Sequence, residues 1–255
     1  MYKKGINNNI KVIKRPTITD INFEIIPPQY TGLDSKYLNG NIVQIDALKG
    51  SKINCIISAN QPLQSAYLTT NKFDIILFNK ISSTAWGSTL DIIEDYTIEL
   101  TIENFNQLKN NPLLLYRLKA IHDLPPEIYK ISPIDQSFEI NNINNPLLLS
   151  FQINDDYGLE KSFIEYSIIK PDYIQSDSSL NTKIINIYPP QTTYYKETYN
   201  WDISNYNLFP GDQIKFRLVC KDNNPELGFS KTPYFYAILP SFDNLFEALE
   251  SDEEE

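Results

Sequence analysis

Two stretches of the chain alternate between apolar and polar residues in the same way. In residues 214–221 every second position is apolar, and the positions between carry Lys215, Arg217 and Lys221. Residues 96–103, which lie 118 positions earlier, repeat the alternation with tyrosine, isoleucine and leucine. A period of two places one face of a β-strand against a core and the other in solvent. The pattern predicts one sandwich strand that is present in two copies.

The same alternation, interrupted by turn residues, predicts further strands on both sides of these two. Pro27 and Pro28 cannot donate to a strand ladder, so the first strand is predicted to be an edge strand that ends there. In the first half, strands are expected within residues 21–25, 42–59 (two strands around a turn at 49–51), 62–68, 73–78, 91–104 and 114–121. In the second half they are expected within 128–132, 138–140, 147–153, 158–166, 184–188 and 234–239.

The length of 255 residues favours two domains, and Pro125 and Pro126 mark a short, stiff linker between them. Hydrophobic residues make up 42% of the chain and aromatic residues 13%, which is enough for a sizeable core in each domain. The predicted segments are a flexible basic stretch (1–16), a first β-sandwich (17–123), a second β-sandwich (124–240) and a helix with an acidic tail (241–255).

The pattern changes to a helical one after the second sandwich. Ser241 can cap a short helix in which apolar residues recur at intervals of three and four. So short a helix is marginal alone, so its apolar stripe is expected to dock on the second domain or to bind a partner outside the chain. The predicted partner-binding residues are Phe242, Leu245, Phe246 and Leu249.

The formal net charge of −10 comes mostly from the C-terminus, where six acidic residues fall within the last nine positions. The remaining 26 acidic and 22 basic residues are nearly balanced, so nucleic acid has no basic surface to bind. Residues 3–15 carry five basic side chains. They predict a flexible lead-in, with a basic arm beside a membrane surface as the alternative.

Cys55 and Cys220 fall in predicted core strands of different domains, so they are expected to be buried free thiols rather than a disulfide. No apolar run approaches the roughly 20 residues of a membrane helix, and Met1 is not followed by a signal-peptide core. Any membrane attachment is therefore expected to come through segments outside this chain.

Acidic and amide side chains cluster at two predicted strand ends. Calcium prefers such oxygen donors, and loops at one end of a sandwich can bring distant segments together. The alternative is that these residues only form turns. The candidate calcium ligands are Asp155, Asp156, Asp222, Asn223 and Asn224, and no other cofactor is expected.

A second candidate is an aromatic region that could stack on a glycan or a protein. It contains Tyr188, Tyr194, Tyr195, Tyr199 and Trp201. Because tyrosine is also a common strand residue, these side chains could equally belong to a strand. Catalysis is not expected, since His122 is the only histidine and no nucleotide-binding or zinc motif is present.

Four runs resemble the extracytoplasmic part of an uncharacterised family of large bacterial membrane-anchored proteins. They are PPQYTGL, GSKINCIISANQPLQSAYL, NDDYGLEKSFIEY and WDISNYNLFPGDQIKFRLVCKDNN, and the resemblance covers roughly residues 17–245. It implies an all-β fold of two tandem immunoglobulin-like β-sandwich domains, here with a short C-terminal α-helix. The family's membrane helices and long helical region have no counterpart in these 255 residues.

The resemblance implies a periplasmic or cell-surface location and no assigned activity. We therefore expect a non-catalytic structural or protein–protein interaction module within a larger membrane-anchored assembly, with other cell-envelope proteins as partners. The alternatives are a glycan-binding or adhesion module, which would use residues 188–201, and a hydrolase.

Overall fold

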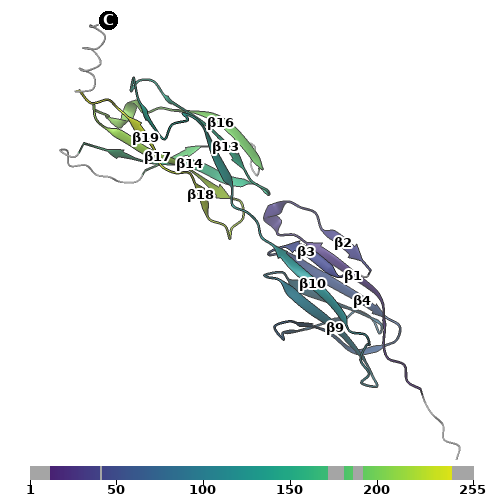
Figure 1. Ribbon diagram of the computed structural model, residues 1–255. Helices are drawn as coiled ribbons and strands as arrows, with labels where there is room; N and C mark the ends of the chain where they lie inside the picture. The colour runs from purple at the N-terminus through teal and green to yellow at the C-terminus, as the bar shows by residue number, and fades with distance from the viewer. Residues whose placement is uncertain (1–11, 41, 172–180, 186–191, 243–255) are drawn as a thin grey trace, which may run out of the picture. The chain divides into compact units, whose positions relative to one another are not determined.

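The computed structural model describes residues 12–40, 42–171, 181–185 and 192–242. Contacts divide the chain into two compact units, Met1–His122 and Asp123–Glu255, and Figure 1 shows that each is built from β-strands. The other regular elements in the described residues are two 3-10 turns, η1 (Gln29–Thr31) and η2 (Ser204–Tyr206). No described helix is long and apolar enough to cross a membrane.

The first unit consists of two five-stranded sheets. One has the order β2-β1-β4-β8-β7, and the other has the order β3-β10-β9-β5-β6. All neighbouring strands are antiparallel except β3, which runs parallel to β10. The bounds are β1 Ile18–Ile26, β2 Lys36–Asn39, β3 Gln44–Leu48, β4 Lys52–Ala59, β5 Leu63–Thr70, β6 Ile75–Leu77, β7 Asn79–Lys80, β8 Ala85–Asp91, β9 Tyr96–Asn104 and β10 Leu114–Ile121.

The second unit also consists of two sheets, with three strands in one and six in the other. A three-stranded sheet has the order β11-β13-β16, and the facing sheet has the order β12-β19-β17-β14-β15, with β18 also paired to β17. Here β12 runs parallel to β19, as β3 does to β10. The bounds are β11 Glu127–Ser132, β12 Ser137–Glu139, β13 Leu147–Asn154, β14 Leu159–Ile169, β15 Asn181–Ile185, β16 Tyr194–Trp201, β17 Gln213–Asp222, β18 Phe229–Lys231 and β19 Phe235–Ile238.

Each unit is a sandwich because its two sheets share one apolar core. In the first unit Phe23 of β1 meets Tyr116 of β10 across the sheets, with ring centroids 5.2 Å apart. In the second unit Trp201 of β16 meets Phe216 of β17 at 5.4 Å. The strand order and the short strand parallel to the last strand make each unit an immunoglobulin-like β-sandwich.

The two alternating stretches singled out from the sequence occupy equivalent positions. β9 lies between β10 and β5, and β17 lies between β19 and β14. Their apolar positions are buried: Ile98 and Leu100 in β9, and Ile214 and Phe216 in β17, are each at most 1% exposed. The period-two pattern therefore identified the central strand of the same sheet in both units.

Two strand predictions were wrong in detail. The first strand, predicted as an edge strand, is interior, because β1 pairs with β4 on one side and with β2 on the other. The short polar run of β2 gave no alternation from which to predict it. The single strand predicted over residues 91–104 is the end of β8 followed by β9, and the chain changes sheets between them, at residues 92–95.

The C-terminal helix predicted from Ser241 lies outside the described residues except for its first two positions. Phe242 is 63% exposed. Leu245, Phe246 and Leu249 are not described, so their partner-binding role stays a prediction.

Candidate cation site

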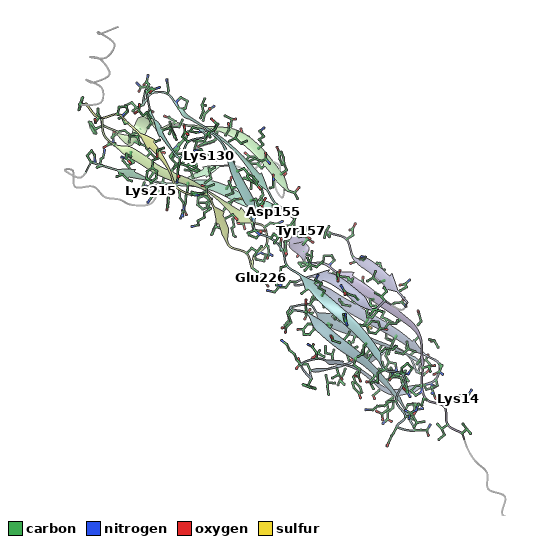
Figure 2. All side chains as sticks on the ribbon, in the orientation of Figure 1. Lys14, Lys130, Asp155, Tyr157, Lys215 and Glu226 are labelled. Atoms are coloured by element: carbon green, nitrogen blue, oxygen red, sulfur yellow. The ribbon has the colours of Figure 1, made fainter. Side chains whose placement is uncertain are left out.

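Three segments meet at one end of the second unit because of its strand register. Glu127, which begins β11, pairs with Asn154, which ends β13, so residues 123–126 lie near the loop after β13. Asp222, which ends β17, pairs with Leu159, which begins β14. Figure 2 shows Asp155 and Tyr157 at this end of the second unit, together with Glu226.

The loop after β13 is held by Asp155. Its Oδ2 accepts hydrogen bonds from the backbone N–H groups of Tyr157 at 2.9 Å and Gly158 at 2.6 Å. Its own backbone N–H donates to the carbonyl oxygen of Thr193 at 2.9 Å. These bonds place the carboxylate at the base of the loop, with Oδ2 directed to the backbone and Oδ1 left over.

The segment after β17 brings a second carboxylate to the same place. Asp222 is fully buried, and its Oδ1 accepts the backbone N–H of Asn224 at 2.7 Å. The amide nitrogen of Asn224 then donates to Oδ2 of Asp123 at 2.8 Å. The side-chain amide of Asn223 donates to the carbonyl oxygen of Tyr157 at 3.0 Å, which ties the two loops together.

Three carboxylate oxygens at this end are buried and accept no hydrogen bond from the described residues. They are Oδ1 of Asp123, Oδ1 of Asp155 and Oδ2 of Asp222. A buried polar atom without a partner costs about 1–3 kcal/mol, and more when it is charged. Three of them in one cluster need a physical explanation.

Burial, and after it the neighbouring carboxylates, raises the pKa of Asp155, Asp156 and Asp222. Burial, with repulsion from Asp155, Asp123 and Asp156, raises the pKa of Asp222 to about 6. Partial desolvation, and after it the neighbouring carboxyl group of Asp123, raises the pKa of Asp156 to about 6, and burial raises that of Asp155. The anionic forms are therefore disfavoured at this end of the unit.

Of the residues predicted as calcium ligands, Asp222 is linked to Asp123 through Asn224, and Asn223 contacts the loop that carries Asp155 and Asp156. Whether they bind calcium stays a prediction. Sequence reasoning missed Asp123, because it placed the first sandwich at residues 17–123, whereas Asp123 is the first residue of the second unit. The signal was available, because the first strand of a sandwich starts at the same end as these two loops.

The cluster is not a preassembled metal centre. Among the described residues no three His, Cys, Asp or Glu side chains have the spacing of one. Like charges separate when nothing lies between them, and calcium sites also use amide, backbone and water oxygens. An ion would therefore have to draw the carboxylates inward.

Most of the predicted aromatic binding region is packed in the core of the second unit. Trp201 is fully buried and its indole N–H donates to the hydroxyl of Tyr206 at 2.8 Å, while Tyr195 is 7% exposed. Tyr199 packs against the same core, and Tyr194 alone is exposed, at 54%. Tyr188 lies outside the described residues. Buried rings cannot stack on a ligand, so this site prediction was wrong for Tyr195 and Trp201.

Both cysteines are buried free thiols, as expected from the sequence. Burial raises the pKa of Cys55 to about 12 and, with repulsion from Asp155 and Asp222, that of Cys220 to about 12. At pH 8 we expect a disulfide reagent to label both thiols of the folded protein at least a hundredfold more slowly than after unfolding in denaturant, because the thiolate is the reactive form. Fast labelling of either thiol in the native protein would show that its core is open.

No family model and no curated protein matches the sequence. The resemblance to a bacterial membrane-anchored family therefore stays a prediction.

Several solved structures are similar to the chain at low identity. A 1.5-MDa bacterial ice-binding adhesin, which is retained at its host cell surface, is 11% identical with a TM-score of 0.41, over 87% of this chain and 65% of that one. The fibronectin(III)-like modules of Clostridium thermocellum CbhA are 11% identical (TM-score 0.23; 78% and 88% covered). A two-domain fibronectin type III segment of chicken tenascin is 14% identical (TM-score 0.23; 76% and 94% covered).

Proposed function

We propose that the chain is a non-catalytic structural or protein-interaction module. Its chemically reactive groups support this, since both thiols are packed in cores and the single histidine is exposed at the last residue of the first unit. A hydrolase would need a nucleophile or a carboxylate pair in an accessible cleft. Immunoglobulin-like sandwiches instead bury their alternating side chains and offer the outer strands and loops to partners.

The observation that carries the proposal is an exposed apolar row at the edge of the first unit. Phe73 is 86% exposed, Ile75 63% and Leu77 69%. They lie on β6, the outermost strand of its sheet, and on the turn that leads into it. Apolar side chains on an edge strand favour association with another chain.

The turn holds Phe73 in a costly backbone conformation. Its φ of 68° lies in the left-handed region, where a bulky side chain is disfavoured by about 1–2 kcal/mol. The N–H of Phe73 donates to the carbonyl oxygen of Thr70 at 2.9 Å, and Oγ1 of Thr70 accepts from the N–H groups of Lys72 and Asp74. A strained residue that presents an aromatic ring to solvent is typical of a binding position.

We infer that the occupant of this row is the apolar surface of another protein of the cell envelope. The location outside the cytoplasm and the membrane-anchored assembly are proposals that rest on the sequence resemblance. An aromatic photo-crosslinking residue at Phe73 should give an adduct of one defined mass in the native envelope. The same residue at Leu148 is the matched control, because Leu148 is 57% exposed but lies on β13, which is paired on both sides. Identical adducts at both positions, or none at Phe73, would count against the proposal.

Replacing Phe73 by glycine separates binding from folding. Glycine adopts a positive φ without strain, so the variant should unfold at the wild-type temperature or a few degrees above it. It should also lose the complex with the partner, because the exposed ring is gone. Thermal unfolding and co-purification from the envelope measure the two effects. A variant that unfolds at a clearly lower temperature would show that Phe73 serves the fold and not a partner.

A further inference from the structure

We propose that Asp123, Asp155, Asp156 and Asp222 bind a calcium ion at one end of the second unit. Asp222 carries the argument furthest, because it is fully buried and its Oδ2 has no hydrogen-bond partner among the described residues. The other oxygen, Oδ1, accepts the backbone N–H of Asn224, whose side-chain amide donates to Asp123, so the two carboxylates are linked through one residue.

A role in turns accounts for only half of these oxygens. In Asp155 and Asp222 one carboxylate oxygen accepts backbone N–H groups of the following loop, and in Asp123 one accepts the amide of Asn224. The second oxygen of each carboxylate is buried and left over. An aspartate that only caps a turn has no reason to bury its other oxygen beside two further carboxylates.

A cation is the group that would offset this cost. The ion pairs found among the described residues join other side chains, such as Arg217 with Glu165 and Lys170 with Asp212, and none involves the four aspartates. Buried carboxylates without a counter-ion destabilise a fold. A divalent ion between them would replace mutual repulsion by attraction.

The donor set favours calcium among the biological cations. All four side chains offer hard carboxylate oxygens, and no histidine or cysteine sulfur takes part, which argues against zinc and copper. Calcium accepts six to eight oxygens in irregular geometry, whereas magnesium requires a near-ideal octahedron. The carboxylates come from three separate segments, two of them loops, so an irregular sphere completed by water is expected.

A hollow in the surface reaches two of the four aspartates. It lies on the second unit, has a volume of about 490 Å³ and is lined by Asp155 and Asp156 together with the chain from Leu124 to Glu127. Asp156 is exposed, so it can capture the ion from solvent. A partly exposed site of this kind is expected to have a Kd of about 0.1–1 mM, the range of extracellular calcium modules.

Bound calcium would fasten Asp123, the first residue of the second unit, to the loops that follow β13 and β17. This inference is independent of the proposed protein interaction, because the exposed apolar row belongs to the first unit. If calcium does not bind, the proposed protein interaction is unaffected, and the reverse also holds.

The direct test is titration of the chelator-treated chain with CaCl₂ or MgCl₂, followed by calorimetry and thermal unfolding. We expect one calcium ion per chain and a rise of about 5–10 °C in the unfolding temperature of the second unit at a hundredfold excess over Kd. Magnesium should bind at least tenfold more weakly. Absence of both heat and thermal shift with calcium would overturn the proposal, and equal binding of magnesium would overturn the assignment to calcium.

Substitutions separate ligation from a structural role. Asp222→Asn should weaken calcium binding at least tenfold, yet unfold in chelator at the parent temperature or above, because the leftover buried charge is gone. Asp156→Asn, at an exposed position, should weaken binding about tenfold with the fold intact. Asp135→Asn, an exposed acid of the same unit, is the matched control and should bind as the parent does. Equal destabilisation of Asp222→Asn with and without calcium would make Asp222 a turn residue only, and would overturn the proposal.

Discussion

Replacement of Phe216 by alanine will lower the unfolding free energy of the second unit by about 3–5 kcal/mol, the range for deletion of a buried phenylalanine. Phe216 is 1% exposed on the central strand β17. Its ring meets Trp201 of the facing sheet at 5.4 Å and Phe235 at 5.6 Å. The cavity would open where the two sheets touch, so the neighbouring rings cannot refill it cheaply.

The chain supplies its own reporters for this experiment. Of its two tryptophans, Trp86 lies in the core of the first unit and Trp201 in that of the second. Ile98, at the equivalent position of β9, is the matched control, and its replacement by alanine should cost the first unit about 2–5 kcal/mol. Denaturant unfolding of Phe216→Ala and of Ile98→Ala is followed by tryptophan fluorescence. Repeating it with either Trp86 or Trp201 replaced by phenylalanine leaves one reporter and assigns each transition to its unit.

Each substitution should shift the transition of its own unit and leave the other within about 0.5 kcal/mol. If Phe216→Ala and Ile98→Ala each shift one common unfolding transition, the two cores unfold together. That outcome would contradict the description of two self-contained sandwiches.

Replacement of Lys170 by methionine will lower the unfolding free energy of the second unit by about 2–3 kcal/mol. Asp212 is buried in the turn before β17, and Oδ2 of Asp212 pairs with Nζ of Lys170 and accepts the N–H of Phe209 at 2.7 Å. Without Lys170 the carboxylate would be buried and without a counter-ion, which costs about 3–5 kcal/mol when both partners are fully buried. The Lys170 side chain keeps 22% exposure, so the expected loss is smaller.

A double substitution tests whether charge is the cause. Asparagine at position 212 keeps an oxygen for the N–H of Phe209 but carries no charge. Lys170→Met combined with Asp212→Asn should therefore recover more than half of the loss, as measured by denaturant unfolding. A double variant as unstable as Lys170→Met alone would place the effect in lost side-chain packing instead.

Strand positions could be predicted wherever one face of the strand is buried. β10 and β13 alternate throughout, and β9 and β17 do so except at Thr101 and Val219, because a buried face imposes apolar residues at every second position. Short edge strands carry no such constraint. β2 and β7 have no buried side chain, so nothing in their residue order distinguishes them from turns.

The aromatic region failed for a related reason. In β16 only Tyr195 and Trp201 are buried, and exposed Glu197 interrupts the alternation between them. The residues of β16 therefore suggested an exposed binding surface, although the rings of Tyr195 and Trp201 pack in the core. Composition alone cannot distinguish a stacking platform from a strand whose aromatic residues point inward.

The candidate cation site was predicted in part. Asp155 and Asp222 were found because acidic residues at strand ends are visible in the sequence. Asp123 was not found, because its contribution depends on strand register. The register brings Asp123 close to Asp156 and Asn224, which are 33 and 101 positions away in the sequence. The leftover oxygens can be recognised only once the hydrogen bonds of each carboxylate are known.

Amide hydrogen exchange tests most directly the central claim that the chain contains two equivalent sandwiches built for packing. β9 and β17, each central in its sheet, should hold the slowest-exchanging amides of their units, with protection close to that of global unfolding. Exchange in either strand at the rate of an unstructured peptide would contradict the account, because that unit would then lack the core that its alternating residues are proposed to form.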